Sequence, residues 1–349
     1  MIDFARRHWL AGACLLFVLV LPIIDPQMPS SLRVASLCVP IMIYAIIGLG
    51  LNVVSGFTGL LNLGSAAFMA VGAYTFSILT CPIYPFALGF WSALGAATMV
   101  GTLTGLLLGL PTMRLRGDYL AIVTLGFGEI VQDVLKNLDA ITKGTQGLNP
   151  VAPAALPGVT FPSTAQDYRP WYYLFLALLL AAVWICTALR RSRIGRAWVA
   201  VREDELAARC MGVATARVKL GALAFGAALC AAGGALYASY SGTSIEPAFY
   251  DFQRSVIILC IVIVGGLGSI RGVLLGALIM VGFNSIILTK VTEAMNRSGV
   301  SGSNVLASPD NWKYLIFGLA LVLMMRLKPE GLLPAQDVQA ELHRGRGAP

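Results

Sequence analysis

The sequence predicts an all-α polytopic membrane protein with about ten transmembrane segments. Hydrophobic residues make up 57% of its 349 residues and charged residues only 12%, which is about half the charged share of soluble proteins. The mean hydropathy of +0.78 agrees. The apolar residues also gather in long runs, most of which approach the roughly 20 residues that a helix needs to cross a bilayer. We therefore expect lipid to solvate most of the surface.

Ten apolar segments are predicted to cross, namely residues 9–24, 34–54, 57–79, 86–110, 119–135, 171–189, 218–240, 255–267, 272–289 and 312–325. The first is interpreted as a retained helix, because Asp25-Pro26-Gln27 follows it where a signal peptide would carry a small-residue cleavage site. The third is rich in Gly and polar residues and the eighth is short. These two are the candidates for broken or re-entrant helices.

Charge predicts the orientation. The net charge of +8 comes from basic residues between apolar runs, where they set the orientation of spans and do not indicate nucleic-acid binding. With ten spans and an inside N-terminus, 17 of the 25 Lys and Arg residues fall inside. The positive-inside rule thus predicts that both termini are cytoplasmic.

The chain is predicted to form one transmembrane domain, residues 1–330, with a short cytoplasmic tail, residues 331–349. The external loop 137–170 is rich in Pro and Gly, and two interpretations stay open: a passive linker, or a docking surface or outer gate. The largest cytoplasmic loop, residues 190–219, contains good helix formers from Arg202 to Met211. Asp204 is placed to start this helix and Gly212 to stop it. The helix either docks a soluble partner or only connects two spans.

The predicted spans contain few ionisable side chains. Glu129 lies near mid-span, and Asp133 lies one turn further along the same helix face. One pair of acids on one helix provides too few ionisable groups for a proton relay, which usually runs through several helices. The sequence lacks a G-x-x-x-x-G-K-[ST] nucleotide loop, so any energy for transport must come from another subunit, while a channel stays possible. The seven cysteines form no C-x-x-C pair, and we predict neither a catalytic nor a metal site.

Two glycine-rich stretches, residues 55–65 and 265–272, interrupt the two halves. They indicate either discontinuous helices that face a polar substrate or close helix packing through small residues. On the first interpretation, the translocation path is predicted to be lined by Asn52, Ser55, Thr58, Asn62, Thr124 and Glu129.

Four sequence motifs resemble those of a known protein family. GLNVVSGFTGLLNLGSAAFMAVGAY (50–74), LRGDYLAIVTLGFGEI (115–130), REDELAARCMGVATARVKLGALAFGAALCAAGGALYA (202–238) and GGLGSIRGVLLGAL (265–278) occur in this order. The chain resembles the permeases of branched-chain amino acid ABC importers, specifically the LivM-type subunit. The resemblance is strong from about residue 49 to residue 278.

The resemblance implies a permease of the bacterial inner membrane without catalysis of its own. It implies as partners a second, LivH-type permease, two ATPase subunits that carry the ATP and Mg, and a periplasmic or tethered substrate-binding protein. It also makes loop 190–219 the coupling loop that contacts an ATPase, through Arg202, Glu203, Asp204, Glu205, Ala207, Ala208 and Gly212.

The sequence departs from the family pattern at two places. Ser65 stands where the family often has His, and Lys143-Gly144-Thr145 replaces a usual glycine pair. The substrate therefore stays open between branched-chain amino acids and the urea, short amides or aromatic acids that relatives carry.

Overall fold

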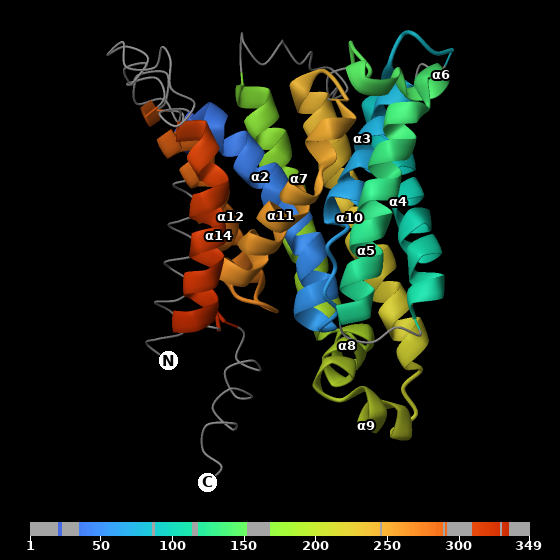
Figure 1. The fold of residues 1–349 in the computed structure, drawn as a ribbon, viewed down its shortest axis with the longest axis vertical. Coiled ribbons are helices and arrows are strands. Elements are labelled where there is room, and N and C mark those ends of the chain that lie inside the picture. The colour runs from blue at the N-terminus through green and yellow to red at the C-terminus, as the bar shows by residue number, and fades with distance from the viewer. Residues whose placement is uncertain are drawn as a thin grey trace.

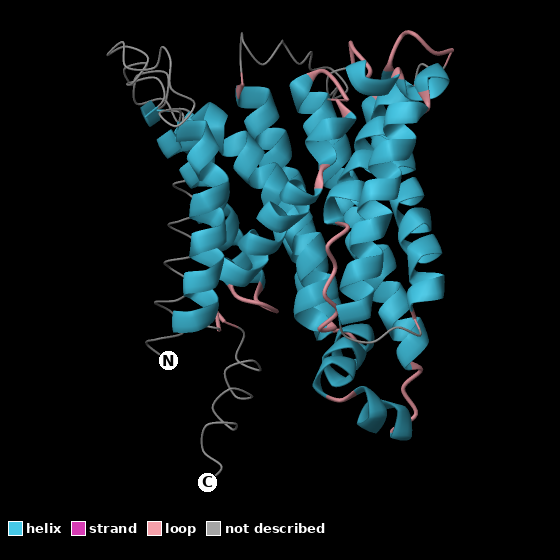
Figure 2. Ribbon diagram, in the orientation of Figure 1, coloured by secondary structure: helices cyan, strands magenta, loops and turns pink. Residues whose placement is uncertain are grey.

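The structure is a computed structural model that describes residues 20–22, 35–85, 88–113, 118–151, 168–244, 246–288, 290–291, 309–328 and 330–334. Over these ranges the regular secondary structure is helical and contains no strand, as predicted (Figure 2). The helices run mostly along one direction and form a bundle (Figure 1).

Five helices in the described part of the chain are long and apolar enough to cross a membrane: Leu37–Phe57, Phe90–Thr112, Arg169–Arg191, Thr215–Ser241 and Ile270–Ile287. Three apolar helices are shorter: Ser65–Thr80, Phe252–Gly265 and Leu315–Leu327. The predicted first span, residues 9–24, lies almost entirely outside the described residues. The fold is thus a multi-helix membrane domain, and the number of ten spans stays a prediction.

The third predicted segment is broken, as expected. Helix α2 (Ala35–Leu51) continues into a π-helix, η3 (Asn52–Phe57), and residues 58–64 are not helical before α3 (Ser65–Thr80) begins. This non-helical stretch runs beside α5 (Asp118–Asn137), where Leu63 N–H donates to the Thr124 hydroxyl at 3.0 Å. The loop is visible between the helices in Figure 2.

The eighth predicted segment is α11 (Phe252–Gly265), which follows a 3₁₀ turn, η5 (Pro247–Tyr250). Its 14 residues extend about 21 Å, less than the roughly 30 Å of a hydrocarbon core. Near its start the Ser255 hydroxyl accepts a hydrogen bond of 3.0 Å from Ala66 N–H of α3. The two short helices therefore begin at the same place in the bundle.

Helix α10 (Thr215–Ser241) packs against α2, α3 and α4 (Phe90–Thr112). The contacts use small residues: a methyl group added at Gly72 would clash with the backbone of Ala231, and one at Gly234 with the backbone of Met69. Small residues let membrane helices approach closely. The second glycine stretch is used in the same way, since Gly265 and Gly272 pack backbone to backbone between α11 and α12 (Ile270–Gly282).

The remaining elements lie at the two ends and at the periphery. At one end, α7 (Arg169–Arg191) leads into α8 (Arg193–Glu203) and α9 (Glu205–Cys210), which project from the bundle, whereas α6 (Asp139–Thr142) and η4 (Gly144–Gln146) lie at the opposite end (Figure 1). Helix α12 continues into a second π-helix, η6 (Phe283–Leu288), and α14 (Pro309–Leu327) flanks the bundle.

The chain after α14 packs back onto the domain. Leu332 N–H donates to Val264 O and Leu333 N–H to Gly265 O, each at 3.0 Å. These bonds satisfy carbonyls at the end of α11 that have no partner within the helix. The first residues of the predicted tail thus contact the membrane domain, and residues 335–349 lie outside the described residues.

Candidate functional site

The loop 190–219 folds as two helices. Asp204 caps α9, because its carboxylate accepts hydrogen bonds from Leu206 N–H (2.7 Å) and Ala207 N–H (3.0 Å). Gly212 ends the turn with a φ of +83°, a left-handed conformation that favours glycine. The predicted start and stop are confirmed. Arg202 and Glu203, the first residues of the predicted run of helix formers, belong to the end of α8, and Asp204 breaks the chain between the two helices.

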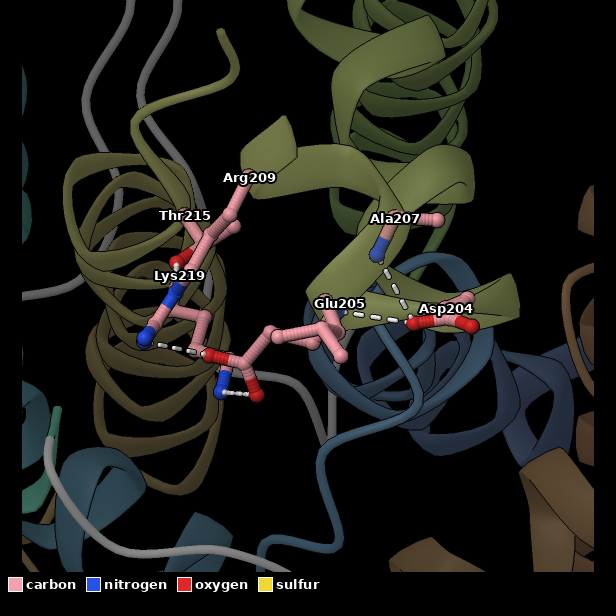
Figure 3. Close-up of polar contacts among 7 residues, drawn as sticks. Asp204, Glu205, Ala207, Arg209, Thr215 and Lys219 are labelled. Carbon is pink, nitrogen blue, oxygen red and sulfur yellow. Dashed lines mark hydrogen bonds and ion pairs between the residues drawn. The ribbon is translucent and has the colours of Figure 1, made fainter. Parts of the chain in front are cut away.

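Glu205 holds α9 against α10. Its carboxylate lies 2.6 Å from Lys219 Nζ and 3.0 Å from Arg209 Nη2, and Arg209 Nε donates to the Thr215 hydroxyl at 2.9 Å (Figure 3). Lys219 is buried, and a buried ammonium needs such a partner. This cluster of Glu205, Lys219, Arg209 and Thr215, called the loop clamp below, fixes how α9 is presented.

The exposed tip of the loop carries two large apolar side chains. Leu206 is 68% exposed and Met211 84% exposed. Ala207 and Gly212 are exposed beside them, and so is Glu203 at the end of α8. Ala208, in contrast, is only 5% exposed. Leu206 and Met211 are not among the predicted coupling residues, because a helix of six residues is too short for its periodicity to show which side is exposed.

Arg202 points toward the membrane domain. Its Nη1 donates to Gly56 O, the carbonyl near the end of η3, at 2.8 Å. Beside it, the rings of Trp198 and Phe57 stack at 6.4 Å, and the Arg190 guanidinium lies 5.7 Å from the centre of the Phe57 ring. The predicted coupling residues therefore divide: Arg202, Glu205 and Ala208 face inward, Asp204 caps, and Glu203, Ala207 and Gly212 are exposed.

Five of the predicted path residues, Asn52, Ser55, Thr58, Asn62 and Thr124, are buried around the break between η3 and α3. Their oxygens bond to the backbone. The Ser55 hydroxyl donates to Leu60 O (3.0 Å) and that of Thr58 to Val54 O (2.6 Å). Asn52 Oδ1 accepts from Gly268 N–H and Asn62 Oδ1 from Gly64 N–H, each at 2.9 Å. In this conformation these side chains bridge and cap the broken helix.

The sixth predicted path residue, Glu129, lies apart from this cluster. It is exposed on α5, as is Asp133, whose carboxylate lies 3.6 Å from Lys136 Nζ. Tyr119, Ile122 and Ile130 are exposed on the same helix. Helix α5 corresponds to the predicted fifth span, residues 119–135, but it is not among the described helices that are long and apolar enough to cross a membrane. An ionisable side chain of a span is costly where it faces lipid. Among the described residues, Glu129 on this face of α5 is thus the predicted path residue that is exposed, whereas the other five are buried.

The described chain is a multi-helix membrane domain with broken helices and a two-helix loop at one end, and the comparisons with known proteins identify its family. Residues 33–325 match the family described as branched-chain amino acid transport system / permease component. The chain belongs to this family.

Similar proteins agree with the family. The chain is 38% identical, over 95% of its length and 77% of the relative, to the high-affinity branched-chain amino acid transport system permease protein LivM of Escherichia coli. It is 24% identical, over 85% of its length and 92% of the relative, to the corresponding permease protein LivH of Salmonella typhimurium. No solved structure matches the chain.

Proposed function

We propose that this chain is the LivM-type permease subunit of an ATP-driven importer, which moves branched-chain amino acids, or a related small polar or amphipathic solute, across the bacterial inner membrane. The similarity to LivM over nearly the whole chain supports the type of subunit. The observation that carries the ATP-driven part is the apolar tip of Leu206 and Met211, which the loop clamp presents outside the bundle. Exposed apolar side chains at one spot of a polar loop are typical of a protein contact.

The partners follow from this role. The tip contacts one of two ATPase subunits, which bind the ATP and Mg, so this chain needs no cofactor and is not an enzyme. A LivH-type permease forms the other half of the membrane part, and a periplasmic or tethered binding protein delivers the substrate. Nucleic acid is no partner. With loop 190–219 in the cytoplasm, both termini are cytoplasmic and residues 137–170 are external.

The translocation path runs along the α5 face that carries Glu129, at the boundary with the second permease. A carboxylate at that depth is stable against protein or water but costly against lipid. The buried cluster of Asn52, Ser55, Thr58, Asn62 and Thr124 opens to the path when the permease changes conformation. Uptake is then alternating access, a shift between two arrangements.

The test is uptake by the reconstituted transporter. Vesicles loaded with ATP and containing this chain with its LivH-type, ATPase and binding-protein partners are expected to accumulate radiolabelled leucine, and vesicles loaded with ADP are not. The substrate class is decided by comparing the ATP-driven uptake of leucine with that of urea, a short amide and an aromatic acid, each measured separately.

Two rival mechanisms predict other outcomes. Uptake that stops when the proton gradient is dissipated in ATP-loaded vesicles would identify a proton-coupled transporter. Flux in both directions without any ATPase subunit would identify a channel.

A further inference from the structure

Arg202 joins the two-helix loop to the broken helix of the membrane domain. Its guanidinium donates to the carbonyl of Gly56 at 2.8 Å, across 146 residues of sequence. The contact is close along the side chain as well, since a Cβ atom built on Gly59 would lie 3.1 Å from Arg202 Cγ. Arg202 thus spans from the end of α8 to the place where η3 gives way to the non-helical stretch 58–64.

Aromatic packing strengthens the same junction. The Phe57 and Trp198 rings stack with an angle of 21° between their planes, and Trp198 Nε1 donates to Val218 O of α10 at 2.9 Å. Trp198 is almost fully buried. The end of η3 is therefore clamped by α8, which is in turn fixed to the helix that follows the loop.

The other end of η3 connects to the second half of the chain. Asn52 Oδ1 accepts from Gly268 N–H at 2.9 Å, in the turn that joins α11 and α12. The approach leaves no spare room, because a Cβ atom on Gly56 would lie 2.5 Å from Gly268 N. A continuous series of contacts thus leads from α8 through η3 to the second glycine-rich interruption.

A π-helix suits a moving link. Its hydrogen bonds are one residue longer than those of an α-helix, and single π-turns inside α-helices occur often at functional sites. Changing such a turn to α geometry shifts the register by one residue, which is about 1.5 Å along the axis. A pull on the Gly56 carbonyl at one end would thus displace Asn52 at the other.

We propose that Arg202 is a positioning residue that transmits movement of the loop 190–219 to η3, and that Asn52 passes this movement on to the α11–α12 turn. Arg202 therefore acts inside the membrane domain and not on the ATPase surface, where the family resemblance placed it. This inference rests on the proposed function, because it presupposes that an ATPase moves the loop.

The test compares three variants in the complete transporter: Arg202→Ala, Arg202→Lys, and Arg193→Ala as a matched control on the exposed side of the same helix. We expect Arg202→Ala to co-purify with its ATPases as the wild type does and to hydrolyse ATP, while uptake falls about tenfold, a typical size for coupling between two sites. Arg202→Lys keeps a donor for the Gly56 carbonyl and should restore most of the uptake. Arg193→Ala should behave as the wild type.

A second measurement follows the link itself. Hydrogen exchange of the peptide that covers residues 52–57 should differ between the nucleotide-free and the ATP-trapped transporter. The difference should disappear in Arg202→Ala. A merely structural Arg202 would change stability but leave this nucleotide-dependent difference in place.

The outcomes separate the inference from the proposed function. If Arg202→Ala loses its ATPases, Arg202 serves the docking surface, and the inference is overturned while the proposed function stands. Unchanged uptake by Arg202→Ala, or no rescue by Lys, also overturns it. If Arg202→Ala does not accumulate in the membrane, the wild-type transporter decides. Hydrogen exchange at residues 52–57 that does not change with nucleotide, in a wild-type transporter that actively takes up substrate, overturns the inference. If the wild type never binds ATPases, both proposals are wrong.

Discussion

Lys219 Nζ lies 2.6 Å from the Glu205 carboxylate, and this ion pair ties the short helix α9 to the first turns of α10. Glu205 also holds Arg209. Its carboxylate is thus occupied within the loop and does not form the free acidic contact that its place in the coupling motif suggests. The pair sets the direction in which Leu206 and Met211 project.

Breaking this pair should loosen the tip. Glu205→Gln leaves the buried Lys219 ammonium without its carboxylate, at a cost of about 1–3 kcal/mol, between the values for exposed and buried pairs. We expect weaker co-purification with the ATPases and normal membrane insertion. Lys219→Met is the informative partner variant: it removes the charge that needs compensation while Arg209 still holds Glu205, so its effect should be smaller. A larger loss in Lys219→Met than in Glu205→Gln would contradict this account.

The tip itself should carry the contact energy with the ATPase. Leu206→Glu and Met211→Glu each place a charge where we expect an apolar contact, and losing a central anchor of an interface costs about 2 kcal/mol, which is about 30-fold in affinity. Pull-down of the ATPase subunit from detergent measures the effect. The matched controls are Leu206→Met and Met211→Leu, which keep the surface apolar and should bind as the wild type does. Normal binding by both Glu variants would show that the loop only connects two spans.

The sequence predicted much of the fold for identifiable reasons. Apolar runs located the described apolar helices, Asp204 and Gly212 located the ends of α9, and glycine with polar residues located the break before Ser65. Each of these signals is local. Which side of the two-helix loop is exposed depends instead on contacts between residues far apart in the chain, such as Arg202 with Gly56 and Glu205 with Lys219. The sequence pattern could not distinguish inward-facing Ala208 from exposed Ala207.

The predicted path residues also show what the sequence alone cannot determine. Polar side chains in a span indicate either a path or a bridge between helices, and composition does not separate the two. The structure shows Asn52 and Thr124 as bridges, because Gly268 N–H and Leu63 N–H need acceptors where the helices break. Glu129 has the open position, which only the packing of α5 against its neighbours reveals.

Orientation is tested with two reporters. A fusion after Arg196 should behave as cytoplasmic and one within residues 149–163 as external, because 17 of the 25 basic residues fall on one side of the predicted topology. Alkaline phosphatase and green fluorescent protein activities report the two sides. Reporter activities that place both sites on the external side would contradict the topology of ten spans.

Glu129 is expected to shape the path without taking part in proton transfer. Glu129→Gln removes the charge and keeps the size, so ATP-driven uptake should fall by no more than about threefold, in line with the modest worth of an exposed charge. Initial uptake rates at several pH values measure the effect. Complete loss of uptake with normal assembly and ATP hydrolysis would instead assign Glu129 direct substrate or proton chemistry.

The junction of the two glycine-rich interruptions should tolerate no added atom. A methyl group at Gly56 would clash with Asn52 Oδ1 and lie 2.5 Å from Gly268 N, so Gly56→Ala must push η3 away from the α11–α12 turn. Overpacking of this kind costs about 1–3 kcal/mol, and here it also breaks the hydrogen bond to Asn52. We expect a lower unfolding temperature for the purified subunit in detergent and a loss of uptake. Gly221→Ala on α10 is the matched control, since the space around Gly221 is open and alanine favours a helix. Equal stability of the two variants would show that the two interruptions separate without cost, and the link from Arg202 through Asn52 to Gly268 would then lack a mechanical basis.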